Sequence, residues 1–200
     1  TGAELARLAE AAGLPVACDW RAYDAVPNDS AAYAGWLGYG RADTLAARLD
    51  ETDLLMLVGC GRGDVLSEGY TAGMDAPTVL AVPDPAATMH DGRIDELVVA
   101  TPAAFVEALA GVDAARLRGA RDDAWMRALA DDQRRFAAPR PDGAERGVDL
   151  GVAFAALDEL LPADRVCTYG AGNATLWGHR HLEHRAPNSL VGPRNGAMGL

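Results

Sequence analysis

This sequence of 200 residues has few aromatic residues and few cysteines, and it has no excess of basic charge and no long apolar run. The three cysteines are far apart and odd in number, so they predict buried thiols in a reducing compartment rather than a disulfide framework or a zinc site. The net charge of −11, without clusters of basic residues, argues against nucleic acid or an anionic membrane surface as a partner. No apolar run approaches the roughly 20 residues that cross a bilayer, and no signal peptide is visible. We therefore expect a cytoplasmic protein.

Helical and strand-like segments alternate along the first two thirds of the sequence. Strands are expected at 15–19, 54–59, 78–82 and 97–100, and helices at 4–12, 41–49, 102–110 and 122–136. The segment 20–40, rich in glycine, is expected to be mostly loop. Residues 54–59 are apolar on both faces, which is typical of a central parallel strand. This order predicts an α/β fold with a doubly wound, Rossmann-like parallel sheet.

A linker and a new helix follow these elements. Residues 137–147 combine proline, glycine and charge, which is typical of an exposed linker. Asp149 is expected to cap a helix that ends at Leu161, and a strand is expected at 165–168. We therefore divide the chain into a first domain (1–136), a linker (137–147) and the beginning of a second α/β domain (148–200).

Two turns of small residues lie near the end of the sequence, each after an expected strand. The first covers Gly170–Asn173 and the second covers Asn195–Gly199. In α/β folds, tight turns at strand ends bring backbone N–H and C=O groups close to a phosphorylated cofactor. The two turns therefore predict a cofactor site.

Six short pieces occur in a distinctive order. They are LAEAAGLPVACD, YAGWLGYGRAD, ETDLLMLVGCGRGD, TVLAVPDP, GNATLW at 172–177 and GAMG at 196–199. In this order they resemble the thiamine-diphosphate-dependent enzymes of the acetolactate synthase, benzoylformate decarboxylase and pyruvate oxidase group. The resemblance implies that 1–136 is the central domain of such an enzyme without its first strand, which would precede Thr1. It also implies that 148–200 is the N-terminal part of the diphosphate-binding domain.

The resemblance implies two cofactors, thiamine diphosphate and Mg²⁺, and five cofactor-binding positions. Gly172, Asn173 and Ala174 would lie against the diphosphate. The backbone of Gly196 would face the aminopyrimidine, and Met198 would wedge between the two cofactor rings. Ala174 and Tyr169 depart from the His and Asp that are common there. The Mg²⁺ ligands and the catalytic Glu of the family would lie outside this chain, so no metal or catalytic residue is assigned.

By resemblance, the full-length protein would act on a 2-keto acid, by acetolactate synthase-like carboligation or by decarboxylation, as a homodimer or homotetramer. The chain by itself would be inactive. Two alternatives remain open. One is a non-catalytic Rossmann-like module that binds nucleotides or serves as a scaffold. The other is an FAD- or NAD-dependent oxidoreductase built on the turn Gly59–Asp64, although the spacing of that turn does not match the dinucleotide fingerprint.

Several other polar residues have simpler interpretations. His179, His181 and His184 spread around a helix at about 100° per residue, which favours a solvated helix face over a metal site. Asp84 is expected to be a turn residue, and Cys60 a buried thiol rather than a nucleophile. Asn173 fits a helix cap as well as it fits a phosphate ligand.

Overall fold

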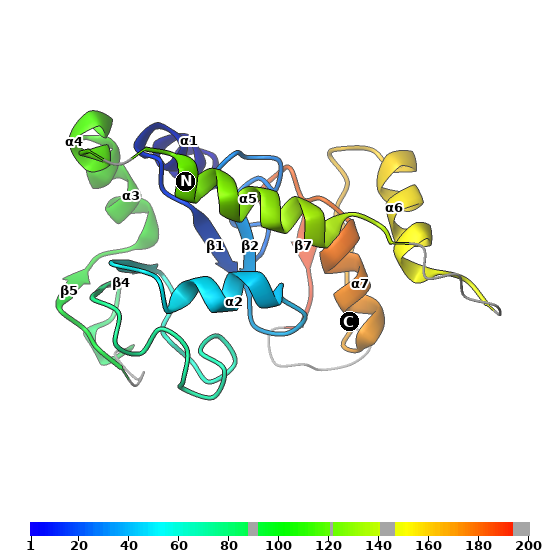
Figure 1. Ribbon diagram of the computed structural model, residues 1–200, viewed down its shortest axis with the longest axis horizontal. Coiled ribbons are helices and arrows are strands. Elements are labelled where there is room, and N and C mark those ends of the chain that lie inside the picture. The colour runs from blue at the N-terminus through cyan, green and yellow to red at the C-terminus, as the bar shows by residue number, and fades with distance from the viewer. Residues whose placement is uncertain (88–91, 121, 141–146, 194–200) are drawn as a thin grey trace.

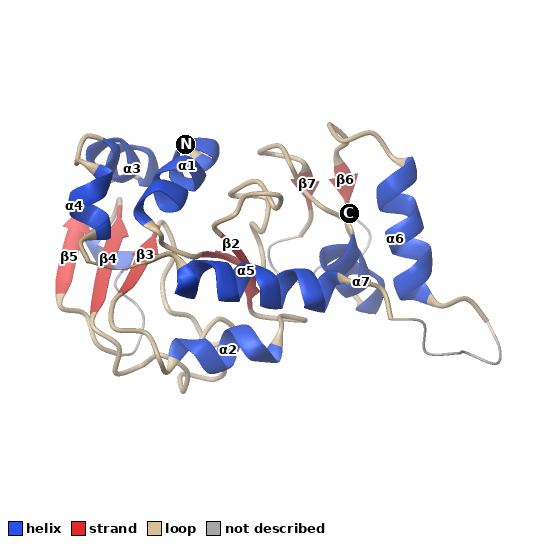
Figure 2. Ribbon diagram, turned by 45° about the horizontal axis from the view of Figure 1, so that its top comes forward, coloured by secondary structure: helices blue, strands red, loops and turns tan. Residues whose placement is uncertain are grey.

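The computed structural model describes residues 1–87, 92–120, 122–140 and 147–193. Helices and strands alternate along these residues (Figures 1 and 2). The helices are α1 (Gly2–Ala12), α2 (Asp43–Leu49), α3 (Pro102–Ala110), α4 (Ala114–Arg118), α5 (Ala124–Ala137), α6 (Leu150–Leu160) and α7 (Asn173–His181), with a 3₁₀ turn at Pro85–Ala87. The strands are β1 (Val16–Asp19), β2 (Tyr33–Leu37), β3 (Leu55–Val58), β4 (Thr78–Val82), β5 (Glu96–Val99), β6 (Cys167–Thr168) and β7 (Leu190–Val191).

Helix boundaries agree with the local sequence signals. The αL conformation of Gly13, with φ of 69°, ends α1. The Thr101 hydroxyl accepts a hydrogen bond from the Ala104 N–H (3.2 Å), and Pro102 occupies the first turn of α3. The Asp149 carboxylate accepts from the Val152 N–H (3.0 Å), which confirms the expected cap of α6. Capping therefore explains where these helices begin and end.

Every strand pairing among the described residues is parallel. The strands form three ladders, in the orders β1–β2, β3–β4–β5 and β6–β7. Parallel neighbours need crossover connections. Among the described pairs, α7 joins β6 to β7, whereas loops and turns join β1 to β2 and β3 to β4. The predicted α/β class with Rossmann-like parallel sheets is confirmed.

The position of β3 corrects one prediction. In the described ladder the central strand is β4, where Leu80 and Ala81 are fully buried, whereas β3 lies at an edge and Met56 is 37% exposed. An uninterrupted apolar run was the reason to expect a central strand at 54–59. That pattern does not distinguish a central strand from an edge strand whose outward side chains are also apolar.

The second correction concerns 20–40, which was expected to be mostly loop. It contains β2, whose Trp36 is fully enclosed in the largest core cluster together with Tyr23. Gly35 obscured the strand in the sequence, but its lack of a side chain has a packing reason. A Cβ at this position, where φ is 101°, would overlap the Gln133 side chain of α5. Glycine therefore lets α5 pack closely on β2.

Helix α5 links the two ends of the described chain. It runs across β2 and α2, and its C-terminal end reaches α7 (Figure 1). The Arg180 guanidinium donates from Nε to the Phe136 carbonyl (2.7 Å), and His181 Nδ1 lies 2.8 Å from the Ala137 carbonyl. None of the described helices is long and apolar enough to cross a membrane.

Candidate functional site

The turn between β6 and α7 is open and presents its backbone. Gly172 is the N-cap residue of α7 and has φ of 123°, a conformation that favours glycine. A Cβ built on Gly172 would meet nothing within 4 Å. The Thr175 hydroxyl donates to the Gly170 carbonyl, and the Thr175 N–H donates to the Gly172 carbonyl (3.1 Å). These bonds define the turn and leave its outer side exposed.

Asn173 is the first helical residue of α7, so its interpretation as the helix cap is wrong. Within the described part of the chain, no side chain caps this helix. Gly172, Asn173 and Ala174 are all exposed. The first N–H groups of a helix have no partner within the helix, and they carry the positive end of its dipole. The turn therefore offers backbone donors to an anionic group.

The β6–β7 ladder brings a second segment to the same edge. The Cys167 N–H donates to the Ser189 carbonyl (2.7 Å) and the Tyr169 N–H donates to the Val191 carbonyl (2.8 Å). Because the strands are parallel, their carboxyl ends meet, and Gly192 lies against Tyr169. This edge is where ligands bind in α/β sheets. The predicted contacts Gly196 and Met198 lie outside the described residues.

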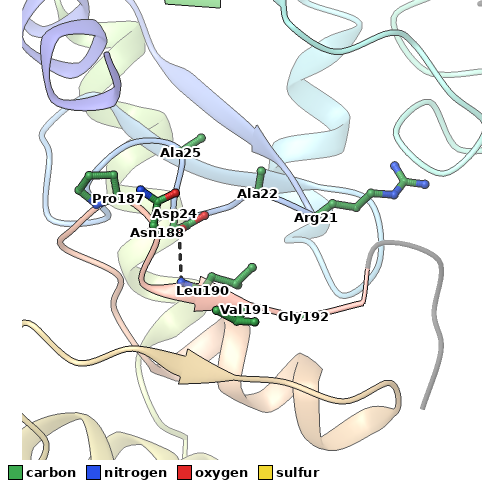
Figure 3. A pocket seen from close by; sticks show the side chains of 9 residues that line it. All are labelled: Arg21, Ala22, Asp24, Ala25, Pro187, Asn188, Leu190, Val191 and Gly192. Carbon is green, nitrogen blue, oxygen red and sulfur yellow. Dashed lines mark hydrogen bonds between the residues drawn. The ribbon is translucent and has the colours of Figure 1, made fainter. Parts of the chain in front are cut away.

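Two cavities flank this edge. An apolar cavity of about 350 Å³ lies at the turn itself, between β6, α6 and α7. Its lining residues are Phe154, Cys167, Thr168, Tyr169, Gly170, Ala174, Thr175 and Leu182. A more polar cavity of about 380 Å³ lies between the loop after β1 and the segment that contains β7 (Figure 3). Both are large enough for part of a small ligand.

The polar cavity is closed on one side by a bond between distant segments. The Leu190 N–H donates to Asp24 Oδ2 (3.1 Å), the dashed line in Figure 3. Arg21 also lines this cavity, but its guanidinium extends away from the Asp24 side. It lies 4.5 Å from the ring centre of Trp20 and 3.5 Å from an Asp19 carboxylate oxygen. Residues that follow β1 and residues of β7 therefore build one wall together.

The three histidines are buried, which corrects the expected solvated helix face. The His179 ring lies 3.8 Å, centre to centre, from the Tyr23 ring, and His181 stacks on Trp177 at 5.7 Å. His184 is 1% exposed. The polar sequence around them suggested a solvated surface, but neutral imidazoles pack well against aromatic rings when they find hydrogen-bond partners.

Burial sets the protonation state of these imidazoles. Desolvation lowers the pKa of His179 to about 3 and that of His184 to about 4, and it also lowers the pKa of His181. All three rings are therefore neutral at pH 7. In the described ranges no three His, Cys, Asp or Glu side chains come together as a metal site.

The turn after β3 lacks the context of a dinucleotide site. No helix follows Gly59 within the described residues 59–77, so a pyrophosphate would have no helix N-terminus there. The Arg62 guanidinium is buried and donates to the Thr78 hydroxyl (2.6 Å). Cys60 is half-buried rather than buried, and desolvation raises the pKa of its thiol to about 11, which opposes a nucleophilic role. Asp84 accepts from the Ala86 N–H (2.9 Å), which confirms a turn residue.

A family model, "Thiamine pyrophosphate enzyme, central domain", matches residues 1–109, more than half of the chain. The chain belongs to the thiamine pyrophosphate enzyme family. No curated protein matches it in sequence. The region that matches the family's central domain contains β1–β5 and α1–α3, and the β6–α7 turn lies beyond it.

Thiamine diphosphate is the cofactor of this family, and the described turn fits its diphosphate end. Gly172 leaves open space in front of the backbone, and α7, with nine residues, directs its N-terminus there. Tyr169, which precedes the turn, is enclosed, and burial raises the pKa of its phenol well above the ordinary value. A neutral, enclosed phenol is poorly suited to hold a metal ion.

A buried cluster connects the central domain with this turn, and the sequence did not reveal it. Tyr23 comes from the loop after β1, and Tyr169 follows β6. His179 lies in α7, and His184 follows that helix. About 150 residues of sequence separate Tyr23 from the others. No local pattern in the sequence indicates that these residues are in contact.

Proposed function

We propose that this chain is part of an enzyme that depends on thiamine diphosphate and Mg²⁺ and acts on a 2-keto acid. The reaction would be an acetolactate synthase-like carboligation or a decarboxylation. The observation that carries the proposal is the family match over residues 1–109 together with an open glycine turn at a parallel strand end. When bound, the cofactor supplies the carbon nucleophile and the electron sink that the side chains lack.

The residues of the turn would bind and orient the diphosphate. Gly172 allows close approach of the backbone, and the N–H groups of Asn173 and Ala174 would donate to phosphate oxygens. Gly196 and Met198 would contact the aminopyrimidine and separate the two rings. The Ala174 methyl lines the apolar cavity, so it contributes shape rather than a polar contact.

The proposal extends to the oligomeric state and the cellular location of the full-length protein. We expect a cytoplasmic homodimer or homotetramer of the full-length protein, with Mg²⁺ held by residues beyond those described. If the protein is instead a non-catalytic nucleotide-binding module, a nucleotide would stabilise it and thiamine diphosphate would not.

Two substitutions at the helix start test the turn. Proline is tolerated at the first position of a helix, where Asn173 lies, but it has no N–H. Asn173→Pro should therefore keep the thermal midpoint of the free protein within a few degrees and weaken thiamine diphosphate binding at least ~10-fold, the cost of a lost charge-assisted bond. Asn173→Ala keeps the N–H and is the matched control.

The measurement is the thermal midpoint of the full-length protein across a titration of thiamine diphosphate at saturating Mg²⁺. Wild type should be stabilised, Asn173→Ala slightly less, and Asn173→Pro least. Equal stabilisation of wild type and Asn173→Pro would exclude this turn as the diphosphate site. No stabilisation of any of them at millimolar cofactor would exclude the proposed function.

A further inference from the structure

His184 joins the two strands that end at the candidate site. It follows α7, is 1% exposed, and uses both ring nitrogens. Nδ1 lies 2.8 Å from the Ser189 hydroxyl, and Nε2 lies 3.2 Å from the Tyr169 hydroxyl. Ser189 directly precedes β7, and Tyr169 directly follows β6. One side chain therefore connects the start of one strand to the end of its neighbour.

The ring is suited to this position because it is neutral. A neutral imidazole has one donor and one acceptor, and each hydroxyl partner can take the complementary role. Ser189 and Tyr169 are buried as well, so these bonds are shielded from water. The charged groups near His184 are Asp24 and Asp158, which favour its protonation, and Arg165, which opposes it, as does burial itself.

The backbone of His184 is also fixed, from the side of the central domain. Its N–H donates to the Asn28 side-chain oxygen (2.8 Å), and its carbonyl accepts from the Asn28 N–H (2.9 Å). The Asn28 amide in turn donates to the Tyr23 carbonyl (2.8 Å), and the Tyr23 ring lies edge-on to the His184 ring. Both ends of His184 are therefore held, one by the loop after β1 and the other by the β6–β7 ladder.

Tyr169 transmits this constraint to the turn. Its ring packs so closely on α7 that a Cβ at Gly178 would overlap it. The carbonyl of the next residue, Gly170, accepts the hydrogen bond from the Thr175 hydroxyl that closes the turn. The position of the Tyr169 ring therefore sets both the turn and the axis of the helix behind it.

We propose that His184 is a positioning residue for the cofactor turn. Through Tyr169 it fixes the turn Gly170–Ala174, and through Ser189 it fixes the segment that enters β7. The effect of His184 on cofactor binding rests on the proposed function. Its ordering of the turn does not.

The test uses three variants of the full-length protein. His184→Leu removes both side-chain bonds, and His184→Gln keeps a donor and an acceptor at a similar reach. His181→Leu is the matched control, because His181 is also buried and bonds to the Ala137 carbonyl, but its ring stacks on Trp177 rather than bonding to Tyr169. Two quantities are measured for each variant. One is amide hydrogen exchange within 169–175 without cofactor, read at the bonded N–H groups of Tyr169 and Thr175, and the other is the Kd for thiamine diphosphate with Mg²⁺.

His184→Leu should accelerate exchange at 169–175 at least tenfold and raise the Kd at least tenfold relative to His181→Leu at equal thermal stability. His184→Gln should restore both to within about threefold of wild type. If His184→Leu and His181→Leu have the same effect on exchange at 169–175, the positioning role is wrong. If exchange responds as expected but wild type binds no cofactor, the proposed function fails and the ordering of the turn by His184 stands.

Discussion

Acid should destabilise this protein through two of its buried histidines. His179 and His184 lie in the contact between the loop after β1 and the segment 169–190. Burial lowers the pKa of His179 from 6.5 to about 3 and that of His184 from 6.5 to about 4. The folded state therefore binds fewer protons than the unfolded state between these values. The contribution of these two rings to the free energy of unfolding should be fully present above pH 6.5 and should decrease as the pH falls towards 4.

The size of the effect follows from these values. Below the pKa of 6.5 in the unfolded state, each buried histidine lowers the free energy of unfolding by about 1.4 kcal/mol per pH unit. Over the two units from pH 6.5 to 4.5, this amounts to about 2–3 kcal/mol for each histidine. The pair together should remove about 4–6 kcal/mol, a large part of the 5–15 kcal/mol that is typical of a folded domain. We therefore expect the free energy of unfolding to decrease steeply well above the pH at which most carboxylates are protonated.

Urea unfolding followed by tryptophan fluorescence at pH 7.5, 6.5, 5.5 and 4.5 measures this dependence. The double variant His179→Phe/His184→Gln is the reference, because carboxylates and His181 titrate equally in both proteins. The wild-type slope between pH 6.5 and 5 should exceed that of the variant by about 2–3 kcal/mol per pH unit, about 1.4 for each histidine. Equal slopes would refute the buried, neutral state of these rings.

Three other pairs of substitutions, each a test and its control, probe the packing and the cofactor turn. Gly178→Ala would place a methyl group against the Tyr169 ring and should cost about 1–3 kcal/mol, whereas Gly63→Ala, with open space around its Cβ, should change the free energy of unfolding by less than about 0.5 kcal/mol. Leu80→Ala in the fully buried centre of β4 should cost about 2–5 kcal/mol, and Leu160→Ala, 80% exposed on α6, much less; both are read from urea midpoints. Gly172→Val forces a β-branched residue to φ of 123° and should reduce thiamine diphosphate affinity, as measured by calorimetry, more than Ala171→Val does.

The sequence predicted most helices because their ends carry local chemistry. Gly13, Pro102 and Asp149 act within one turn of their own helix, so their roles are visible without tertiary structure. The parallel class also followed, from strands alternating with helices. These features depend on neighbours in the chain, which the sequence displays directly.

Features that depend on distant contacts were missed. Strand β2 was hidden because Gly35 serves the packing of α5 rather than a turn. The buried state of His184 depends on Tyr23 and Asn28, far away in the chain, which no local pattern reveals. The candidate site stays a prediction: the turn at 172–174 is open, which is compatible with a diphosphate contact, whereas the polar network beside it was not anticipated.

Binding of thiamine diphosphate tests the proposed function most directly, and isothermal titration calorimetry measures it. Thiamine diphosphate titrated into the full-length protein with Mg²⁺ should bind once per chain with a Kd in the micromolar range, and binding should weaken when Asn173 is replaced by proline. An absence of binding heat at millimolar thiamine diphosphate, at two temperatures, would show that the protein is not a thiamine-diphosphate-dependent enzyme.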